Sequence, residues 1–413
     1  MANKILLAIA DGLGDRPCEC LGERTPLEYA DTANLDRLAE NGSAGIMDVY
    51  QAGIPVGTDL GHLILFGYGI EDYPGRGPIE AFGSGMELIG GDVAIRCDFS
   101  TVDEAGVVTD RRAGRIREGT GELAAAVNGI VVDGIEILFK EATEHRAVLV
   151  LRGVGLSSCI SDTDPKKEGL PVCPARALDG SAEAEFTASV LNKVMEKVRE
   201  IWKEHPVNLQ RQKQGLLPAN AILTRGAGTM TQLEKITKRL GFSACCVASE
   251  RTVLGVARLA GFDIRTDESF TGNIDTDYRK KARFAVDALK EHDLVALHFK
   301  ATDLMGHDNH PKGKALAIET YDRMLGVVQE LVDQEIKDNV IIALAADHST
   351  PCERREHSGD PVPILISGKN IRKDSVSHYD EISCSQGGLG RMKGAEFCNT
   401  LLDYLEVTVK QGN

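Results

Sequence analysis

Carboxylates and imidazoles stand close together at several points of the sequence, in a combination that could bind divalent metal ions. Asp347 is adjacent to His348, and Asp303 and His307 show an Asp-x-x-x-His spacing. Carboxylate oxygens mixed with imidazole nitrogens suit an ion such as Mn²⁺ or Zn²⁺, and the number of candidates suits two ions. A pair of ions can hold the attacking and leaving oxygens of a phosphoryl transfer. The candidate ligands are Asp11, Asp303, His307, Asp347, His348 and His357.

Each of these residues also has an ordinary alternative role. A single Asp at the end of a strand is more often a helix cap or a turn residue, and a single His is more often a satisfied polar residue. However, three of the ten histidines fall beside these carboxylates in the sequence. The set as a whole therefore favours metal binding.

Thr58 is the candidate nucleophile. It follows a turn that contains Gly and Pro, and it precedes an apolar, helix-like stretch. A hydroxyl at a helix N-terminus faces free backbone N–H groups and the positive end of the helix dipole, which favours an alkoxide or its phosphoester. Thr is also a common N-cap, and the segment alone favours that role. A neighbouring pair of metal ions reverses the preference, because metal ions can hold the hydroxyl deprotonated.

Arginines are grouped in the middle of the chain. In an acidic protein, arginines beside small residues suit bidentate binding of phosphate and carboxylate groups. Taken singly, each arginine could equally well pair with a surface glutamate. The candidates for anion binding are Arg111, Arg112, Arg115, Arg146 and Arg225.

Continuous apolar runs precede the carboxylate candidates and predict the elements that position them. Residues 5–10 end at Asp11, residues 340–346 end at Asp347, and residues 294–299 lead to Asp303. Continuous hydrophobicity indicates strands that are buried on both faces of a parallel sheet covered by helices. Such sheets bind ligands at the carboxyl ends of their strands. Helical patterns lie between the runs, at residues 34–41, 279–292 and 315–334.

The middle of the chain has strand signals and a long helical pattern of its own. Segments rich in Gly and Pro frame it, at residues 73–78 and 271–273. We therefore expect an α/β protein in which residues 1–75 and 271–413 form one domain. We expect a smaller α/β domain, residues 76–270, to be inserted into it.

The composition excludes several classes of protein. The 413 residues include 47 Lys and Arg against 62 Asp and Glu, and the net charge of −15 repels nucleic acids and anionic membrane surfaces. No apolar run approaches the roughly 18–20 residues that span a bilayer. The first run ends in a carboxylate rather than in a signal-peptide cleavage site, and the ten scattered cysteines fit reduced thiols. We expect a cytoplasmic protein that acts on a small molecule and binds neither nucleic acid nor membranes.

Ordered motifs run along nearly the whole chain. They are Asp11-Gly-Leu-Gly-Asp-Arg-Pro17, Arg24-Thr-Pro-Leu-Glu28, Gly75-Arg-Gly-Pro-Ile-Glu-Ala81, Asp110-Arg-Arg-Ala-Gly-Arg115, Arg225-Gly-Ala-Gly228, Lys300-Ala-Thr-Asp-Leu-Met-Gly-His-Asp308, Asp347-His-Ser-Thr-Pro-Cys352, His357-Ser-Gly-Asp-Pro-Val-Pro363 and Gly387-Gly-Leu-Gly-Arg391. Together they resemble the archaeal-type, cofactor-independent phosphoglycerate mutases, a family of the alkaline phosphatase superfamily. The resemblance implies an alkaline-phosphatase-like parallel-sheet sandwich that is interrupted by an inserted transferase domain.

The resemblance also implies two divalent metal ions and no 2,3-bisphosphoglycerate. Mn²⁺ is the expected ion, with Zn²⁺, Co²⁺ or Mg²⁺ as alternatives. The motifs assign the ligands of the two ions to two groups. One group is Asp11, Thr58, Asp347 and His348, and the other is Asp303, His307 and His357.

The activity implied by the resemblance is the interconversion of 3-phosphoglycerate and 2-phosphoglycerate. Thr58 would take the phosphoryl group, the glycerate would turn while the grouped arginines hold it, and the phosphoryl group would return to the other hydroxyl. Asp110 would serve as an acid/base and Lys300 as a phosphate contact.

One departure from the family pattern leaves an alternative open. The family's usual Pro-Gly-Ser-Asp turn reads Val56-Gly57-Thr58-Asp59 here, so Thr replaces Ser, and Ala33 replaces a Pro in a second motif. The methyl group of Thr restricts χ1 and crowds the approach to the hydroxyl. The alternative is a phosphohydrolase or phosphomutase that acts on another small phosphorylated or phosphonylated acid. A binding protein without activity is a third, weaker hypothesis, and the sequence leaves the oligomeric state open.

Overall fold

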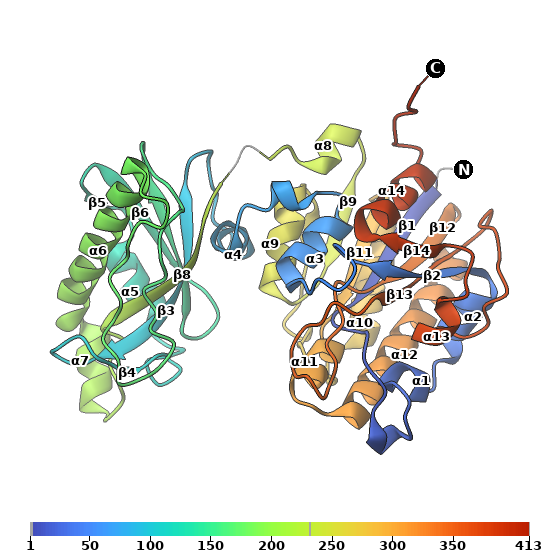
Figure 1. Ribbon diagram of the computed structural model, residues 1–413, viewed down its shortest axis with the longest axis horizontal. Coiled ribbons are helices and arrows are strands. Elements are labelled where there is room, and N and C mark those ends of the chain that lie inside the picture. The colour runs from blue at the N-terminus through green and yellow to red at the C-terminus, as the bar shows by residue number, and fades with distance from the viewer. Residues whose placement is uncertain (1–2, 231–232, 413) are drawn as a thin grey trace. The chain divides into compact units, whose positions relative to one another are not determined.

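The chain folds into two compact units, and one of them interrupts the other in sequence. The computed structural model describes residues 3–230 and 233–412. Residues 1–73 and 234–413 form the first unit, here called the split unit, and residues 74–233 form the inserted unit. In Figure 1 the blue start and the orange-to-red end of the chain lie together in the split unit. The expected α/β fold with an inserted domain is confirmed.

An eight-stranded sheet forms the centre of the split unit, in the order β10-β9-β11-β1-β12-β13-β2-β14. Its middle strands β11, β1 and β12 are parallel, as their continuous apolar runs predict, and β13 is antiparallel to both of its neighbours. Parallel pairing places the residues that follow β1, β11 and β12 at one edge of the sheet. The strands are β1 (Asn3–Ala10), β2 (Gly42–Asp48), β9 (Ala244–Val247), β10 (Asp263–Arg265), β11 (Leu294–Phe299), β12 (Asn339–Ala345), β13 (Val362–Ser367) and β14 (Gly390–Lys393).

Helices cover this sheet in two groups. Helix α12 packs against α10, α11, α1 and α2, whereas α3 packs against α9 and α14, and Figure 1 shows the sheet between the two groups. No helix in the described ranges is both long and apolar enough to cross a membrane. The helices are α1 (Pro26–Tyr29), α2 (Ala33–Glu40), α3 (Thr58–Leu65), α8 (Ile236–Leu240), α9 (Arg251–Ala260), α10 (Tyr278–Leu289), α11 (Ala301–His307), α12 (Pro311–Glu335), α13 (Glu381–Cys384) and α14 (Gly394–Tyr404).

The inserted unit has an antiparallel sheet and a core of its own. Its strands follow the order β4-β3-β7-β6-β5, and β8 also pairs with β3. Along β3, Ile95 and Cys97 face the core beneath α5 and α6, while Ala94 faces α4, because successive side chains of a strand point to opposite faces. The elements are α4 (Arg76–Gly83), β3 (Val93–Val102), β4 (Val108–Asp110), α5 (Thr120–Val127), β5 (Ile130–Val132), β6 (Ile135–Glu141), β7 (Arg146–Arg152), α6 (Ala182–Lys203), α7 (Pro206–Lys213) and β8 (Ala221–Thr229).

The structure places the second boundary of the insert at residues 233 and 234, and not at residue 270 as the sequence predicts. The apolar segment near residue 245, expected in the insert, is β9, and it pairs in parallel with β11 of the split unit. Strand β10 then pairs with β9 and extends the same sheet. Residues 234–270 therefore belong to the split unit. The Thr-Gly-Asn segment at residues 271–273, expected as the second boundary, is a loop within that unit.

One carboxyl group joins the C-terminal segment to the loop that follows β1. Glu381, the first residue of α13, accepts a hydrogen bond at Oε1 from the backbone N–H of Asp15 (3.3 Å) and one at Oε2 from the Thr25 hydroxyl (2.8 Å). Removal of this carboxyl group from water raises the pKa of Glu381 to about 7. In the folded protein the group therefore takes up a proton at a higher pH than it does in the unfolded chain.

Glu381→Gln is expected to change the pH dependence of stability. Because its folded-state pKa is raised, the carboxyl group favours the wild-type fold at low pH, and this contribution is lost as the pH rises through about 7. The free energy of unfolding of the variant, relative to that of the wild type, should therefore increase between about pH 4 and pH 8. Urea unfolding at several pH values measures the difference, with exposed Glu19→Gln as the control for loss of a charge. A difference that is constant with pH would contradict the prediction.

Candidate active site

The first group of ligand candidates lies where β1 and β12 end. Asp11 follows β1, and Asp347 and His348 follow β12 across one loop residue. The Nε2 atom of His348 lies 3.4 Å from Asp11 Oδ1 and 3.3 Å from Asp347 Oδ2. All three side chains are buried. The register of the parallel strands thus brings together residues that are far apart in the sequence.

Each of the two carboxylates keeps one oxygen without a hydrogen-bond partner among the described residues. These atoms are Asp11 Oδ1 and Asp347 Oδ2. The other oxygen of Asp347 accepts from the backbone N–H of Gly12 (3.2 Å), and that of Asp11 accepts from Lys300 Nζ (3.0 Å). A buried carboxylate oxygen without a partner is costly unless a cation faces it. The donor set therefore fits a divalent ion.

The second group, Asp303, His307 and His357, brings two imidazole lone pairs together. The Nδ1 atom of His307 lies 2.9 Å from the Arg355 carbonyl, and that of His357 lies 2.8 Å from the Val56 carbonyl. Because carbonyl oxygens only accept hydrogen bonds, each Nδ1 carries the hydrogen and each Nε2 keeps its lone pair. The two Nε2 atoms are 3.2 Å apart, and Asp303 Oδ1 lies 3.4 and 3.6 Å from them. This arrangement also fits a cation.

The two ligand groups are contiguous, and the structure adds two residues that the sequence did not indicate. The rings of His348 and His357 stack with their centroids 3.5 Å apart, so His348 also lies within ligand distance of the second group. The Thr350 hydroxyl donates to Asp303 Oδ1 (2.7 Å) and lies 3.0 Å from His348 Nδ1. The carboxylate of Glu356 lies beside the second group. Neither residue stands in a spacing that signals its role.

The structure places the Thr58 side chain among the ligand candidates. Gly57 is the N-cap of α3, and Thr58 is the first residue of the helix, where its side chain forms no capping hydrogen bond with the described residues. Its Oγ1 atom lies 3.2 Å from His348 Nε2 instead. The hydroxyl is therefore directed toward the ligand candidates, as a nucleophile at a metal centre would be.

Lys300 supplies a positive charge beside the ligands. Its Nζ atom lies 3.0 Å from Asp11 Oδ2 and 2.7 Å from Asp303 Oδ2. Burial alone would lower the pKa of Lys300, but the surrounding carboxylates raise it above its usual value. The side chain is therefore a permanent cation, which suits contact with a phosphate group.

The five predicted arginines come together in the inserted unit. They line a hollow of about 400 Å³. Arg111 is held by a bidentate ion pair with Asp164 (3.0 and 2.5 Å), and Arg225 pairs with Asp98. The complete lining is Arg96, Asp98, Arg111, Arg112, Arg115, Glu144, His145, Arg146 and Arg225.

Four buried polar atoms that have no hydrogen-bond partner among the described residues converge on this arginine pocket. They are the Nε atoms of Arg96 and Arg225, Asp98 Oδ1 and His145 Nδ1. Burial also lowers the pKa of Arg96 to about 10. Clustered guanidinium groups with free donors suit an anion that carries several oxygens. The sequence contains a signal for two of the residues it missed, since Arg96 and Asp98 are charged residues that alternate along one face of an otherwise apolar strand.

Asp110 is not part of the pocket lining. Its Oδ1 atom accepts hydrogen bonds from the backbone N–H groups of Arg112 (2.7 Å) and Gly114 (3.2 Å). The side chain thus stabilises the turn that carries the arginines. The acid/base role of Asp110 stays a prediction, and the carboxylates that line the pocket are those of Asp98 and Glu144.

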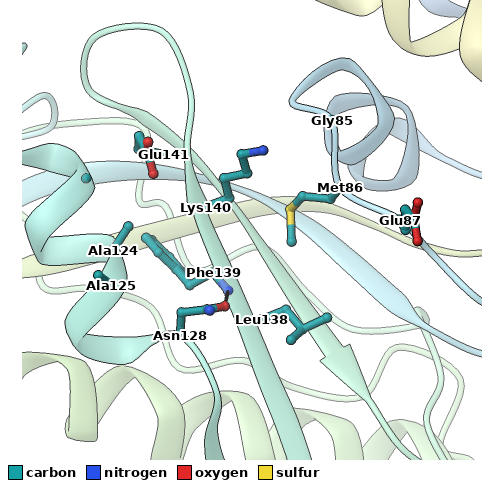
Figure 2. Close-up of a pocket in the computed structure, with 11 residues that line it drawn as sticks. Gly85, Met86, Glu87, Ala124, Ala125, Asn128, Leu138, Phe139, Lys140 and Glu141 are labelled. Atoms are coloured by element: carbon teal, nitrogen blue, oxygen red, sulfur yellow. Dashed lines mark hydrogen bonds between the residues drawn. The ribbon is translucent and has the colours of Figure 1, made fainter.

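A second hollow of the inserted unit, of about 380 Å³, has a different character. Figure 2 shows Met86, Leu138 and Phe139 along its wall. The Asn128 side chain is already engaged, because its Oδ1 atom accepts from the backbone N–H of Phe139 (2.9 Å). The lining also contains Glu87, Lys140 and Glu141, and two carboxylates against one ammonium group do not suit a multiply charged anion, so the hollow is not part of the candidate site.

Comparison with known families gives two matches. A model of 2,3-bisphosphoglycerate-independent phosphoglycerate mutase matches residues 39–208. A model of type I phosphodiesterase / nucleotide pyrophosphatase matches residues 177–360.

Known proteins resemble the chain along its whole length. The 2,3-bisphosphoglycerate-independent phosphoglycerate mutase of Methanopyrus kandleri is 45% identical and covers 100% of this chain and 99% of its own. The corresponding protein of Thermococcus kodakarensis is also 45% identical, over 99% of each chain. Among solved structures, the PH0037 protein from Pyrococcus horikoshii has a TM-score of 0.85 at 38% identity, covering 100% of both chains. The cofactor-independent phosphoglycerate mutase from Thermoplasma acidophilum has a TM-score of 0.74 at 35% identity, covering 98% of this chain and 100% of its own.

Asp303→Ala removes the carboxylate of the second ligand group and should weaken the binding of one of two ions. We expect a loss of affinity of at least about 100-fold for that ion, since even changes outside the ligand set cost roughly 10–100-fold. Calorimetric titration of the chelator-treated protein with Mn²⁺ measures stoichiometry and affinity. Exposed Asp308→Ala is the matched control on the same segment. Two ions bound with wild-type affinity by the Asp303 variant would contradict the assignment.

Proposed function

The chain belongs to the family of 2,3-bisphosphoglycerate-independent phosphoglycerate mutases, and on this basis we propose that it interconverts 3-phosphoglycerate and 2-phosphoglycerate through a phosphothreonine at Thr58. The full-length similarity to proteins of that name supports the mutase over the phosphohydrolase alternative and over a binding protein without activity. The observation that carries the nucleophile assignment is the Thr58 hydroxyl, which lies 3.2 Å from His348 Nε2 and caps no helix N–H. A cytoplasmic location is part of the proposal.

Divalent metal ions belong to the proposed site, and no 2,3-bisphosphoglycerate is needed. We assign one ion to Asp11, Thr58, Asp347 and His348, and the other to Asp303, His307 and His357. The mixture of carboxylate and imidazole donors favours Mn²⁺. When bound, the ions supply positive charge that lowers the pKa of the Thr58 hydroxyl and screens the phosphoryl oxygens.

The proposed reaction has two transfer steps. The Thr58 hydroxyl loses its proton and its oxygen attacks the phosphorus of 3-phosphoglycerate, the bond from phosphorus to the 3-oxygen breaks, and that oxygen takes up a proton. The 2-hydroxyl of the glycerate then loses a proton and attacks the phosphothreonine, the bond from phosphorus to the Thr58 oxygen breaks, and a proton restores the Thr58 hydroxyl. The position of Thr58 in the first turn of α3 favours negative charge on the transferred group, because the positive end of the helix dipole lies there. Lys300 is placed to contact the phosphoryl oxygens from the side of Asp11 and Asp303.

The arginine pocket is proposed to bind the glycerate part of the substrate. A carboxylate matches the planar fork of a guanidinium group, and Asp164 holds Arg111 in a fixed orientation for such a contact. Arg112, Arg115, Arg146 and Arg225 extend the positive lining. We propose Asp98 rather than Asp110 as the group that exchanges a proton with the glycerate hydroxyls, since Asp98 lines the pocket and its Oδ1 atom has no hydrogen-bond partner within residues 3–230 and 233–412.

Thr58→Ala should abolish phosphoenzyme formation and lower kcat by at least about 1,000-fold, because removal of a covalent nucleophile has effects of this size or larger. Phosphorus NMR of the Mn²⁺-free quenched reaction distinguishes 2-phosphoglycerate from 3-phosphoglycerate and from free phosphate. Substrate with a labelled phosphoryl group reports the phosphothreonine. Thr58→Ser keeps the hydroxyl and should retain turnover.

Two outcomes would contradict this assignment. Label that still appears on Thr58→Ala would exclude Thr58 as the nucleophile. Robust release of phosphate by the wild-type protein without any 2-phosphoglycerate would exclude the mutase reaction.

Arg96→Gln should raise the KM for 3-phosphoglycerate by about tenfold or more, because a charge-assisted hydrogen bond to the substrate is lost. Initial rates at saturating Mn²⁺ measure KM and kcat separately. Arg152→Gln is the matched control, because Arg152 pairs with Asp92 in the same unit and does not line the pocket. Equal KM values for wild type and Arg96→Gln would remove Arg96 from the pocket's function.

A further inference from the structure

Two fully buried histidines lie beneath the first group of metal ligands and belong to neither ligand group. His62 is in α3 and His298 is in β11, and both side chains are completely inaccessible to solvent. Their rings meet edge to face, with centroids 5.0 Å apart. A buried polar side chain within an apolar element needs a reason, because its desolvation opposes folding.

His298 contacts the carboxylate of Asp11. The register of β1 and β11 places His298 opposite Ile9, close to the point where β1 gives way to Asp11. The Nε2 atom of His298 lies 2.9 Å from Asp11 Oδ2. Because an ionised carboxylate only accepts hydrogen bonds, Nε2 carries the hydrogen and donates it. The contact holds Oδ2 and leaves Oδ1, the oxygen without a partner, facing His348.

His62 connects the nucleophile's helix turn to Asp347. Its Nδ1 atom lies 2.8 Å from the backbone carbonyl of Thr58, one turn earlier in α3. The same atom lies 3.3 Å from Asp347 Oδ2. The carbonyl oxygen only accepts, so Nδ1 carries the hydrogen and donates it to Thr58, and Asp347 Oδ2 lies beside this polarised N–H without forming a hydrogen bond to it. The position of His62 therefore links the backbone of Thr58 to the carboxylate that stands beside it.

We propose that His62 and His298 are positioning residues that orient Asp347 and Asp11 for a divalent ion and hold the Thr58 turn against them. Neither histidine acts as a ligand in this role, because each uses its N–H to fix a group that is a ligand or a nucleophile. Partners of this kind set the orientation and basicity of metal ligands, and their loss costs roughly 10–100-fold in metal affinity. The inference rests on the proposed metal centre but not on the identity of the substrate.

Paired variants separate hydrogen bonding from packing. His298→Gln places an amide N–H near the position of Nε2. In His298→Asn the side chain is one carbon–carbon bond shorter, so its amide does not reach that position, and His298→Leu has no donor. At residue 62 the order reverses, because Asn matches Nδ1 and Gln overshoots. We expect the matched variants, His298→Gln and His62→Asn, to bind Mn²⁺ within about threefold of wild type, and the Leu variants to lose roughly 10–100-fold.

The readouts are independent of catalysis. Calorimetric titration with Mn²⁺ gives the affinity, and the visible absorption of the Co²⁺-loaded protein reports the ligand geometry. His292→Leu is the matched control, because His292 Nδ1 also contacts a carbonyl four residues earlier (Ala288, 3.0 Å), but its Nε2 faces Asp263, which is outside the metal centre. This control should lower the melting temperature without changing either metal readout.

Defined results would overturn the inference. Mn²⁺ binding by the Leu variants with wild-type affinity and an unchanged Co²⁺ spectrum would be sufficient to overturn the inference. If the Leu variants do not fold, equal Mn²⁺ affinities for His298→Gln and His298→Asn, and for His62→Asn and His62→Gln, would also overturn it. Failure of the wild-type protein to bind Mn²⁺ would overturn the proposed metal centre, and the inference with it.

Discussion

The repulsion among buried carboxylates at one edge of the sheet is the constraint on which the rest of the split unit depends. Asp11, Asp303 and Asp347 are almost completely buried. Burial alone would raise the pKa of Asp11 and Asp347. Lys300 and the hydrogen bond from His298 instead hold the pKa of Asp11 well below its usual value. Carboxylates kept ionised in this way form a negatively charged site, and divalent ions are the ligands that match it.

Hydrogen bonds from one buried lysine connect the loops that carry Asp11 and Asp347. Lys314, fully buried in the long helix α12, donates to the carbonyls of Gly14 (3.1 Å) and Thr350 (2.9 Å) and to Asp15 Oδ2 (2.9 Å). One cation thus joins the loop after β1 to the loop after β12. Helix α3 approaches the same place closely, because a Cβ atom at Gly61 would lie only 2.4 Å from the Asp347 carbonyl. The absence of a side chain there lets the Thr58 turn reach the ligands.

The inserted unit gathers positive charge in the arginine pocket, on a sheet and core of its own. Its core contains the stacked rings of Phe99 and Trp202, and the opposite face of β3 carries Arg96 and Asp98. Acidic partners such as Asp164 orient the guanidinium groups and reduce the repulsion among them. The arginines can therefore lie side by side in a positively charged pocket. A protein with a net charge of −15 thereby keeps a local site for an anionic substrate.

Much of the site follows from the sequence, because residue type and local pattern report directly on burial and chemistry. Continuous apolar runs that end at Asp11 and Asp347 predict buried parallel strands with ligands at their ends, and grouped arginines predict an anion pocket. Only the tertiary structure placed His62, His298 and Thr350 against the ligand candidates and left Asp110 out of the pocket lining. It also assigned β9 to the split unit. The physical reason is the same in each case: hydrophobic periodicity reports whether a residue is buried, but its partner is set by strand register and helix packing between distant segments.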